Sequence, residues 1–175
     1  MRRVRYSVAM SLDGYIAGPN GEFDWITPDP DVDFAAMFKA YDTLLMGRKT
    51  YELTRTHKGP GMPGMSVYVI SRTLSPEDCP NVTIVRDPAP LVTELKRQPG
   101  KEIWLFGGGD LFRSLLEANL VDTVEVAIAP VLLGGGLPVL PETSARHTLK
   151  LASHQLYPKT GTLGLSYDLV GSGAA

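Results

Sequence analysis

The sequence has little of several features, and each shortage excludes a class of protein. It has a single cysteine, Cys79, which excludes an intrachain disulfide framework and a cysteine metal cluster. The net charge is −2, so there is no basic surface for nucleic acid or for a membrane. No apolar run approaches the roughly 18 residues of a membrane span. Arg2, Arg3 and Arg5 are not followed by an apolar segment. We therefore expect no signal peptide and a cytoplasmic protein.

Familiar nucleotide and metal motifs are also missing. The histidines His57, His147 and His154 lie far apart without the spacing of a metal site, so no metal is expected. A P-loop would require glycine at position 42, where Asp42 stands. Residues 59–64 match G-x-G-x-x-G formally, but no strand leads into them and two internal prolines favour a loop.

The order of apolar and turn segments predicts one α/β domain over residues 1–171, followed by a disordered tail at 172–175. Strand and helix patterns alternate up to residue 129, and only strand patterns follow, which indicates a mainly parallel sheet with an antiparallel C-terminal edge. A long ordered loop is expected at 11–30. Strands are expected at 5–10, 43–46, 66–70, 82–85, 102–106, 123–129, 149–156 and 163–170, and helices at 32–41, from 49 onward, at 90–97 and at 110–118.

The most informative motif is Gly107-Gly108-Gly109, which lies between an apolar strand pattern and a helix pattern. A strand that ends in glycines before a helix directs free backbone N–H groups and the helix dipole toward one point, which suits an anion. The absent side chains allow a phosphate or a flat ring to approach the backbone. The alternative is a tight turn without a ligand.

Cations follow two other predicted strands. The segments are Gly47-Arg48-Lys49-Thr50 and Ser71-Arg72. Cations at a helix N-terminus oppose the dipole, and an anionic ligand would remove that conflict. Arg48 and Arg72 could flank a 2′-phosphate, the group that distinguishes NADP from NAD, because guanidinium groups bind phosphate oxygens in pairs. The alternative is a pair of solvated basic turns.

Asp29, Asp31 and Asp33 follow Trp25 just before a predicted helix. Aspartates at this position most often cap the helix and complement its dipole. The alternative is that one carboxylate faces a cleft, where it would anchor a substrate ring or relay a proton.

Several of these segments together resemble the dihydrofolate reductase superfamily in order and spacing. They are residues 8–17, 23–25, 45–52, 69–72 and 107–109. Residues 120–122 and 129–136 resemble more closely the reductase domain of bacterial riboflavin biosynthesis. The resemblance spans residues 4–169. It implies a dihydrofolate-reductase-like fold, with an eight-stranded sheet flanked by helices, and NADPH as the hydride donor.

The resemblance also implies roles for individual residues. The backbone of Ala9 and Ile16 would contact the nicotinamide. The remaining cofactor-binding residues would be Gly47, Arg48, Lys49, Thr50, Ser71, Arg72, Gly107, Gly108, Gly109, Asp110, Leu111 and Phe112. Those for the substrate would be Asp13, Trp25, Asp31 and Phe34. A proton would come from Asp33 or from water. The loop of residues 13–25 would close over the nicotinamide.

The sequence therefore predicts an NADPH-dependent reductase that passes a hydride to a heterocyclic or ribosylamino substrate. The expected activity is most like that of 5-amino-6-(5-phosphoribosylamino)uracil reductase. Dihydrofolate reductase activity is one alternative, although Ala127 stands where folate reductases carry a threonine. A non-catalytic NADPH-binding sensor module is another. A homodimer is expected through the C-terminal strands and residues 131–133.

Overall fold

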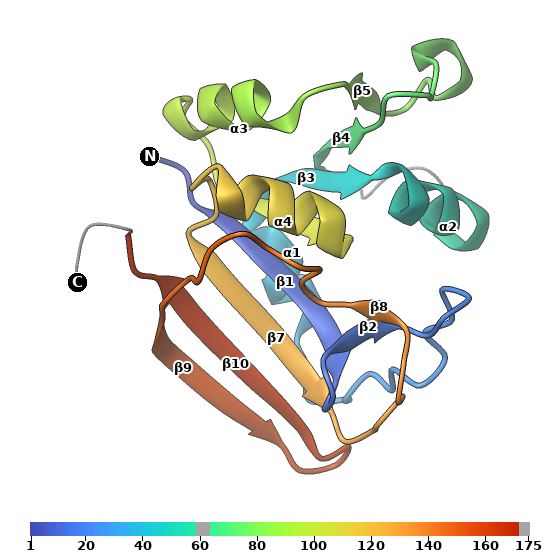
Figure 1. The fold of residues 1–175 in the computed structure, drawn as a ribbon, viewed down its shortest axis with the longest axis vertical. Helices are drawn as coiled ribbons and strands as arrows, with labels where there is room; N and C mark the ends of the chain where they lie inside the picture. Colours follow the sequence, from blue (N-terminus) through green and yellow to red (C-terminus); the bar gives the residue numbers. More distant parts are fainter. Residues whose placement is uncertain (59–63, 172–175) are drawn as a thin grey trace.

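A computed structural model describes residues 1–58 and 64–171, with the backbone alone at 56–58. One eight-stranded sheet runs through the molecule, and helices lie on both of its faces (Figure 1). The strands are β1 (Val4–Ser11), β2 (Tyr15–Ala17), β3 (Tyr41–Gly47), β4 (Ser66–Ile70), β5 (Thr83–Val85), β6 (Glu102–Gly107), β7 (Thr123–Ala129), β8 (Leu137–Pro138), β9 (Leu149–Tyr157) and β10 (Thr162–Leu169). The helices are α1 (Phe34–Lys39), α2 (Arg48–Lys58), α3 (Pro88–Arg97), α4 (Gly109–Glu117) and the short 3₁₀ helix η1 (Pro76–Asp78).

The strand order is β5-β4-β3-β6-β1-β7-β10-β9, and β2 pairs with β8 in a separate two-stranded sheet. Strands β5 to β7 in this order are all parallel, whereas β10 runs antiparallel to β7 and to β9. The expected mainly parallel sheet with an antiparallel C-terminal edge is confirmed. Because the carboxyl ends of parallel strands meet at one edge, the loops after β1, β3, β4 and β6 lie along the same edge.

Two apolar clusters hold the layers together. Helices α3 and α4 pack on one face of the sheet, over Tyr6 and Leu105, with Leu115 fully buried between them and the strands. Helices α1 and α2 cover part of the other face, where Tyr51 and Trp104 are buried. The two faces thus bury separate sets of alternating strand residues.

The structure corrects the predicted fold in two places. The helix expected at 32–41 extends only from Phe34 to Lys39, because Asp33 caps its start and Tyr41 belongs to β3, where its ring stacks on Trp104 at 5.3 Å. The expected loop at 11–30 contains β2, which pairs with β8. The other predicted elements begin and end within two residues of the prediction where it gave both ends, whereas β8 and η1 were not predicted. Most of the loop expected at 59–64, and the tail at 172–175, lie outside the described residues.

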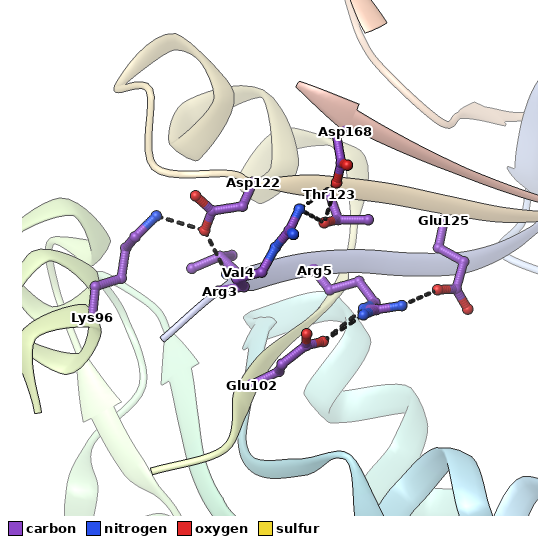
Figure 2. Close-up of polar contacts among 9 residues, drawn as sticks. All are labelled: Arg3, Val4, Arg5, Lys96, Glu102, Asp122, Thr123, Glu125 and Asp168. Carbon is purple, nitrogen blue, oxygen red and sulfur yellow. Dashed lines mark hydrogen bonds and ion pairs between the residues drawn. The ribbon is translucent and has the colours of Figure 1, made fainter. Parts of the chain in front are cut away.

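The amino-terminal end of the central strands is held by an ion pair whose ammonium group is buried and whose carboxylate is half-buried (Figure 2). The Asp122 carboxylate accepts hydrogen bonds from the Val4 N–H at 2.7 Å and from the Lys96 ammonium at 2.6 Å. The Lys96 side chain is only 10% exposed. The bond therefore ties α3 to the sheet beneath it.

Asp122→Ala should lower the free energy of unfolding by about 3 kcal/mol, because it leaves a buried ammonium without its partner. Urea unfolding monitored by circular dichroism measures this. Asp110→Ala is the matched control, since Asp110 is 81% exposed and pairs with Arg113 at 3.4 Å. We expect that control to change stability by less than about 0.5 kcal/mol. Equal effects of the two substitutions would contradict this view of Asp122.

Candidate active site

Three neighbouring strands bring the predicted glycine and cation segments together. In the sheet register, Met46 of β3 lies opposite Gly107 of β6, and Gly47 lies opposite Ile70 of β4. A Cβ built on Gly47 would lie 3.8 Å from the Gly107 carbonyl oxygen. Segments 47–50, 71–72 and 107–109 therefore lie side by side at the carboxyl edge of the sheet.

The three glycines at the end of β6 differ in what requires them. Gly107 has a φ of +120°, which disfavours any side chain. A Cβ on Gly109 would lie 2.7 Å from the Pro138 carbonyl oxygen, so packing of the chain itself requires that glycine. A Cβ on Gly108 would meet nothing closer than 3.8 Å, and its neighbours there are Ile16 and the Thr50 hydroxyl. Neither packing nor a positive φ requires glycine at position 108, and the peptide bond that joins Gly107 to Gly108 is cis.

Gly108 thus forms the base of a small cradle between Ile16 and Thr50. Gly108 is also the N-cap of α4 and makes no side-chain capping bond, so the first N–H groups of this helix are directed out of its N-terminus. A cradle without a side chain, at the N-terminus of a helix, suits the phosphates and ring of a dinucleotide. The residues present therefore fit such a cofactor.

Cations surround this edge of the sheet. Arg48 and Lys49 begin α2, whose first turn contains no acidic residue, and both side chains are exposed. Arg48 forms an exposed ion pair with Glu52 at 3.3 Å, a contact of the kind that is worth little in water and is easily exchanged for a ligand. Arg72 is exposed at the end of β4.

Ser71 and a further arginine organise the end of β4. The Ser71 side chain is buried, and its hydroxyl oxygen accepts hydrogen bonds from the N–H groups of Thr73 and Leu74. Arg86 donates to the Ser71 carbonyl oxygen at 2.8 Å. Arg86 was not among the predicted site residues. The parallel pairing of β4 with β5 could have indicated it, because Arg86 directly follows the residue opposite Ile70.

Ala9 and Ile16, expected near the nicotinamide, lie on β1 and β2 at the same end of the molecule as Gly108. The position of β2 is fixed by close packing against the loop before β8. A Cβ on Gly136 would lie 2.2 Å from the Ala17 carbonyl oxygen, so only glycine allows this approach.

Asp13, expected to bind the substrate, ties this loop to the end of β1. Its carboxylate accepts hydrogen bonds from the Ser11 hydroxyl at 2.6 Å, from the Gly134 N–H at 2.7 Å and from the Leu133 N–H at 3.1 Å. These bonds, that of Ser11 most strongly, hold the pKa of Asp13 below its ordinary value. The carboxylate is charged at neutral pH and is engaged within the chain.

The pKa of Asp13 predicts how the loop responds to acid. A carboxyl group with a lowered pKa in the folded state stabilises its contacts above its ordinary value and loses them as the pH falls through the lowered one. The amide signals of Leu133 and Gly134 should therefore titrate with a midpoint below 3.8, the ordinary value, and should not titrate in Asp13→Asn. Heteronuclear NMR measures both. A midpoint at or above 3.8 would contradict the assignment.

Asp33, predicted as the catalytic residue, lies at the start of α1 with Asp31 and Phe34, which were predicted to bind the substrate. The Asp33 carboxylate is exposed and caps the helix by accepting from the Ala36 N–H at 2.8 Å. Asp31 forms an ion pair with Lys159 at 2.7 Å. Phe34 is 42% exposed. The sequence left two interpretations of Asp33 open, and the structure shows the first of them, helix capping. The role of Asp33 as a proton donor stays a prediction.

Three more of the predicted site residues have side chains that are at least partly buried. They are Trp25, Leu111 and Phe112. The Trp25 indole N–H is buried and has no hydrogen-bond partner among the described residues. The side chains of Leu111 and Phe112 are buried in the core, and Phe112 stacks on Tyr6 at 3.9 Å. These two residues could reach a ligand only through their backbone.

A hollow of about 550 Å³ lies between α1, β7 and the turn after β9. It is bounded by Asp33 and Met37 on the helix side, by Glu125 of β7 and by Tyr157 of β9. Glu125 was missed by the sequence analysis. The alternation in β7 contained the signal, because Thr123, Glu125 and Ala127 must share one face of the strand.

With this geometry established, the comparisons identify the family. The profile of the RibD C-terminal domain matches residues 2–162, and the chain belongs to that family. The Bacillus subtilis (strain 168) protein YyaP is 33% identical over 95% of this chain and 94% of its own length. RibD, a riboflavin biosynthesis protein of Haemophilus influenzae, is 28% identical over 79% of this chain, which spans 50% of that longer protein.

Solved structures agree with the fold. A Shewanella sp. PV-4 protein provisionally assigned to riboflavin biosynthesis superposes with a TM-score of 0.82 and 25% identity, over 97% of this chain and 99% of that one. Dihydrofolate reductase of Enterococcus faecalis, in a complex containing NADP(H), superposes with a TM-score of 0.71 and 17% identity, over 95% and 96% of the two chains. Family membership and these relatives support an oxidoreductase of the RibD and dihydrofolate reductase type.

Two features that the described residues lack bear on other functions. Within residues 1–58 and 64–171, no helix has both the length and the apolar composition needed to cross a membrane. Over the same part of the chain, no group of three or more His, Cys, Asp or Glu side chains is arranged to hold a metal ion.

Proposed function

We propose that the protein is an NADPH-dependent reductase that transfers a hydride to a C=N or C=O bond of a heterocyclic or ribosylamino substrate. The activity would be most like that of 5-amino-6-(5-phosphoribosylamino)uracil reductase. The observation that carries this proposal is the cradle at Gly108, which lies on the same sheet edge as Arg48 and Arg72. The relatives named for riboflavin biosynthesis support the choice of substrate class.

The residues at this edge would divide the work of binding. Gly47, Gly107 and Gly108 leave room for the pyrophosphate and its ribose, and the N-terminus of α4 supplies backbone donors. Arg48, Lys49 and Arg72 would neutralise the 2′-phosphate, with Ser71 and Thr50 as neutral donors. When bound, NADPH supplies the hydride. Asp110 adds a carboxylate to the first turn of α4, beside this binding edge.

The residues around Ala9 and Ile16 would position the substrate and exclude water. The backbone of Ala9 and Ile16 would orient the nicotinamide, and the loop of residues 13–25 would cover it, with Trp25 offering its indole N–H to the substrate. A proton would reach the product from Asp33 or from water. The exposed position of Asp33 favours water as the immediate donor.

A sensor that binds NADPH without turnover is the second candidate. The observation favouring it is that Asp33, the expected acid, is exposed and engaged in capping α1. Anaerobic mixing of the protein and NADPH with 5-amino-6-(5-phosphoribosylamino)uracil, or with dihydrofolate, separates the candidates. Loss of reduced-nicotinamide absorbance with the uracil derivative supports our proposal, and loss with dihydrofolate alone indicates folate reduction. Tight binding of NADPH without loss of absorbance indicates a sensor.

We also propose that the protein is a homodimer formed through β9 and β10. Leu149, Leu151 and Leu156 of the edge strand β9 are 41%, 49% and 57% exposed. A register shift between Ser166 and Tyr167 places all three on one face of the sheet. An apolar edge of this kind favours association with a second copy. Light scattering should give the mass of a dimer for the wild type and of a monomer for Leu151→Asp.

A further inference from the structure

The sheet face beneath α1 carries a charged group that the proposed cofactor site does not use. Arg5, on the central strand β1, donates to Glu102 of β6 at 2.8 Å and to Glu125 of β7 at 2.6 Å (Figure 2). The three side chains are each 26–30% exposed. One guanidinium faces two carboxylates, so the cluster retains one net negative charge.

Glu125 occupies the junction of two hollows. One, of about 710 Å³, is also bordered by Arg5 and Tyr41, and the other is the hollow of about 550 Å³ beneath α1. Met37 of α1 and Glu125 line both. A ligand that enters this space from either side therefore meets the Glu125 carboxylate.

One oxygen of Glu125 is free to accept more hydrogen bonds. Arg5 binds Oε2, whereas among the described residues Oε1 has only a long 3.4 Å contact with the Ser7 hydroxyl. Each carboxylate oxygen can accept two hydrogen bonds. Asp33 lines the same hollow, but its carboxylate is exposed, and Oδ1 accepts a hydrogen bond from the helix it caps.

The position of Glu125 along its strand relates it to the proposed hydride-transfer site. Ser7 lies opposite Glu125, and Ala9 lies opposite Ala127. The two pairs are one same-face step apart, which is about 7 Å along a strand. That step is about the width of a heterocyclic ring, so a ring held near Ala9 would extend toward Glu125.

We propose that Glu125 is a specificity-determining residue, which accepts hydrogen bonds from amino groups on the ring of the substrate. This inference rests on the proposed function for the placement of the substrate. A carboxylate with spare acceptor capacity and an uncompensated charge favours N–H donors and disfavours carbonyl oxygens at the same place. Amino-substituted pyrimidines are thereby selected over pyrimidines that present only oxygens there.

The test compares two small ligands that differ only in two amino groups. The full chain, without cofactor, is titrated with 5,6-diaminouracil and with uracil, and binding is followed through backbone amide signals. The wild type should bind 5,6-diaminouracil about tenfold more tightly, as expected for a hydrogen bond to a charged group. Amides of β7 around Glu125 should shift. The Glu125→Gln variant should bind the two ligands with affinities within about twofold of each other.

Glu102→Gln is the matched control. It removes the other carboxylate partner of Arg5, but Glu102 lines only the larger hollow, so the preference for 5,6-diaminouracil should persist. Equal binding of both ligands by the wild type would overturn the inference. An unchanged preference in Glu125→Gln, or the same loss in Glu102→Gln, would also overturn it. If Glu125→Gln does not fold, Glu125→Asp is measured instead. Its shorter side chain holds the carboxylate farther from the ligand, so the preference for 5,6-diaminouracil over uracil should fall at least about threefold. An unreduced preference in Glu125→Asp would contradict the inference.

The outcomes separate this inference from the proposed function. A fluorescence titration of the same variants with NADPH reports on the cofactor edge alone. Failure of the wild type to bind NADPH overturns the proposed function, whether or not the preference between the pyrimidines is seen. A preference that survives in Glu125→Gln, with normal NADPH binding, overturns only the role of Glu125.

Discussion

Gly108→Ala is expected to weaken NADPH binding by about 30-fold while leaving the fold intact. The added Cβ would lie 3.8 Å from its nearest neighbours in the chain, which is ordinary contact, and the φ of −84° suits alanine. The protein itself therefore tolerates the methyl group. A cofactor seated in the cradle would not, because an extra methyl group in a filled site costs about 1–3 kcal/mol, and about 2 kcal/mol corresponds to 30-fold.

Two other glycines serve as controls for Gly108. Gly135 has open space around its Cβ position and no positive φ, so Gly135→Ala should change neither stability nor NADPH binding. Gly109→Ala should destabilise the fold, because its Cβ would lie 2.7 Å from the Pro138 carbonyl oxygen. Fluorescence titration and thermal unfolding measure the two properties. Unchanged NADPH binding by Gly108→Ala would show that the cofactor does not lie against Gly108.

The double variant Arg48→Ala with Arg72→Ala is expected to bind NADPH at least about 100-fold more weakly, while its affinity for NADH changes less than about threefold. Each charged hydrogen bond to a phosphate contributes about 1.5–3 kcal/mol, so losing two gives a factor of that size or larger. NADH has no 2′-phosphate and loses nothing. The difference between the two coenzymes should shrink as salt is added, since both arginines are exposed.

A variant with the same net charge is the control for the arginine pair. Arg97 and Arg146 are also exposed, and neither follows β3 or β4. Arg97→Ala with Arg146→Ala should bind NADPH normally. Similar losses for NADPH and NADH in the Arg48 and Arg72 variant would contradict the assignment of the 2′-phosphate, because they would indicate a disturbed fold rather than a lost contact.

Much of the fold was predictable because its elements are long and strongly patterned. Strands β4 and β7 have the predicted bounds, since apolar β-branched runs with clear breakers mark them. Strands β2 and β8 have three and two residues, too few for a period-two pattern, and they pair across more than 100 positions of sequence. Tyr41 continued a helical spacing, but stacking on Trp104 places it in β3.

The parts of the candidate site that sheet topology determines could be predicted from the sequence. The parts that depend on individual side-chain contacts could not. Segments that follow parallel strands must meet at one edge, and Gly47, Ser71 and Gly107 do so. Whether Asp33 caps a helix or faces a cleft depends on tertiary contacts that its neighbours in sequence do not encode. The engagement of Asp13 by Gly134 is of the same kind. Glu125 escaped notice because a single carboxylate in an apolar strand is commonly a solvated edge residue.

Calorimetric titration of the wild-type chain with NADPH tests the central claim most directly. We expect saturable binding of one NADPH per chain, with a dissociation constant below about 10 µM, and binding of NADH at least about 100-fold weaker. Absence of heat at millimolar NADPH, or equal affinity for NADPH and NADH, would contradict it.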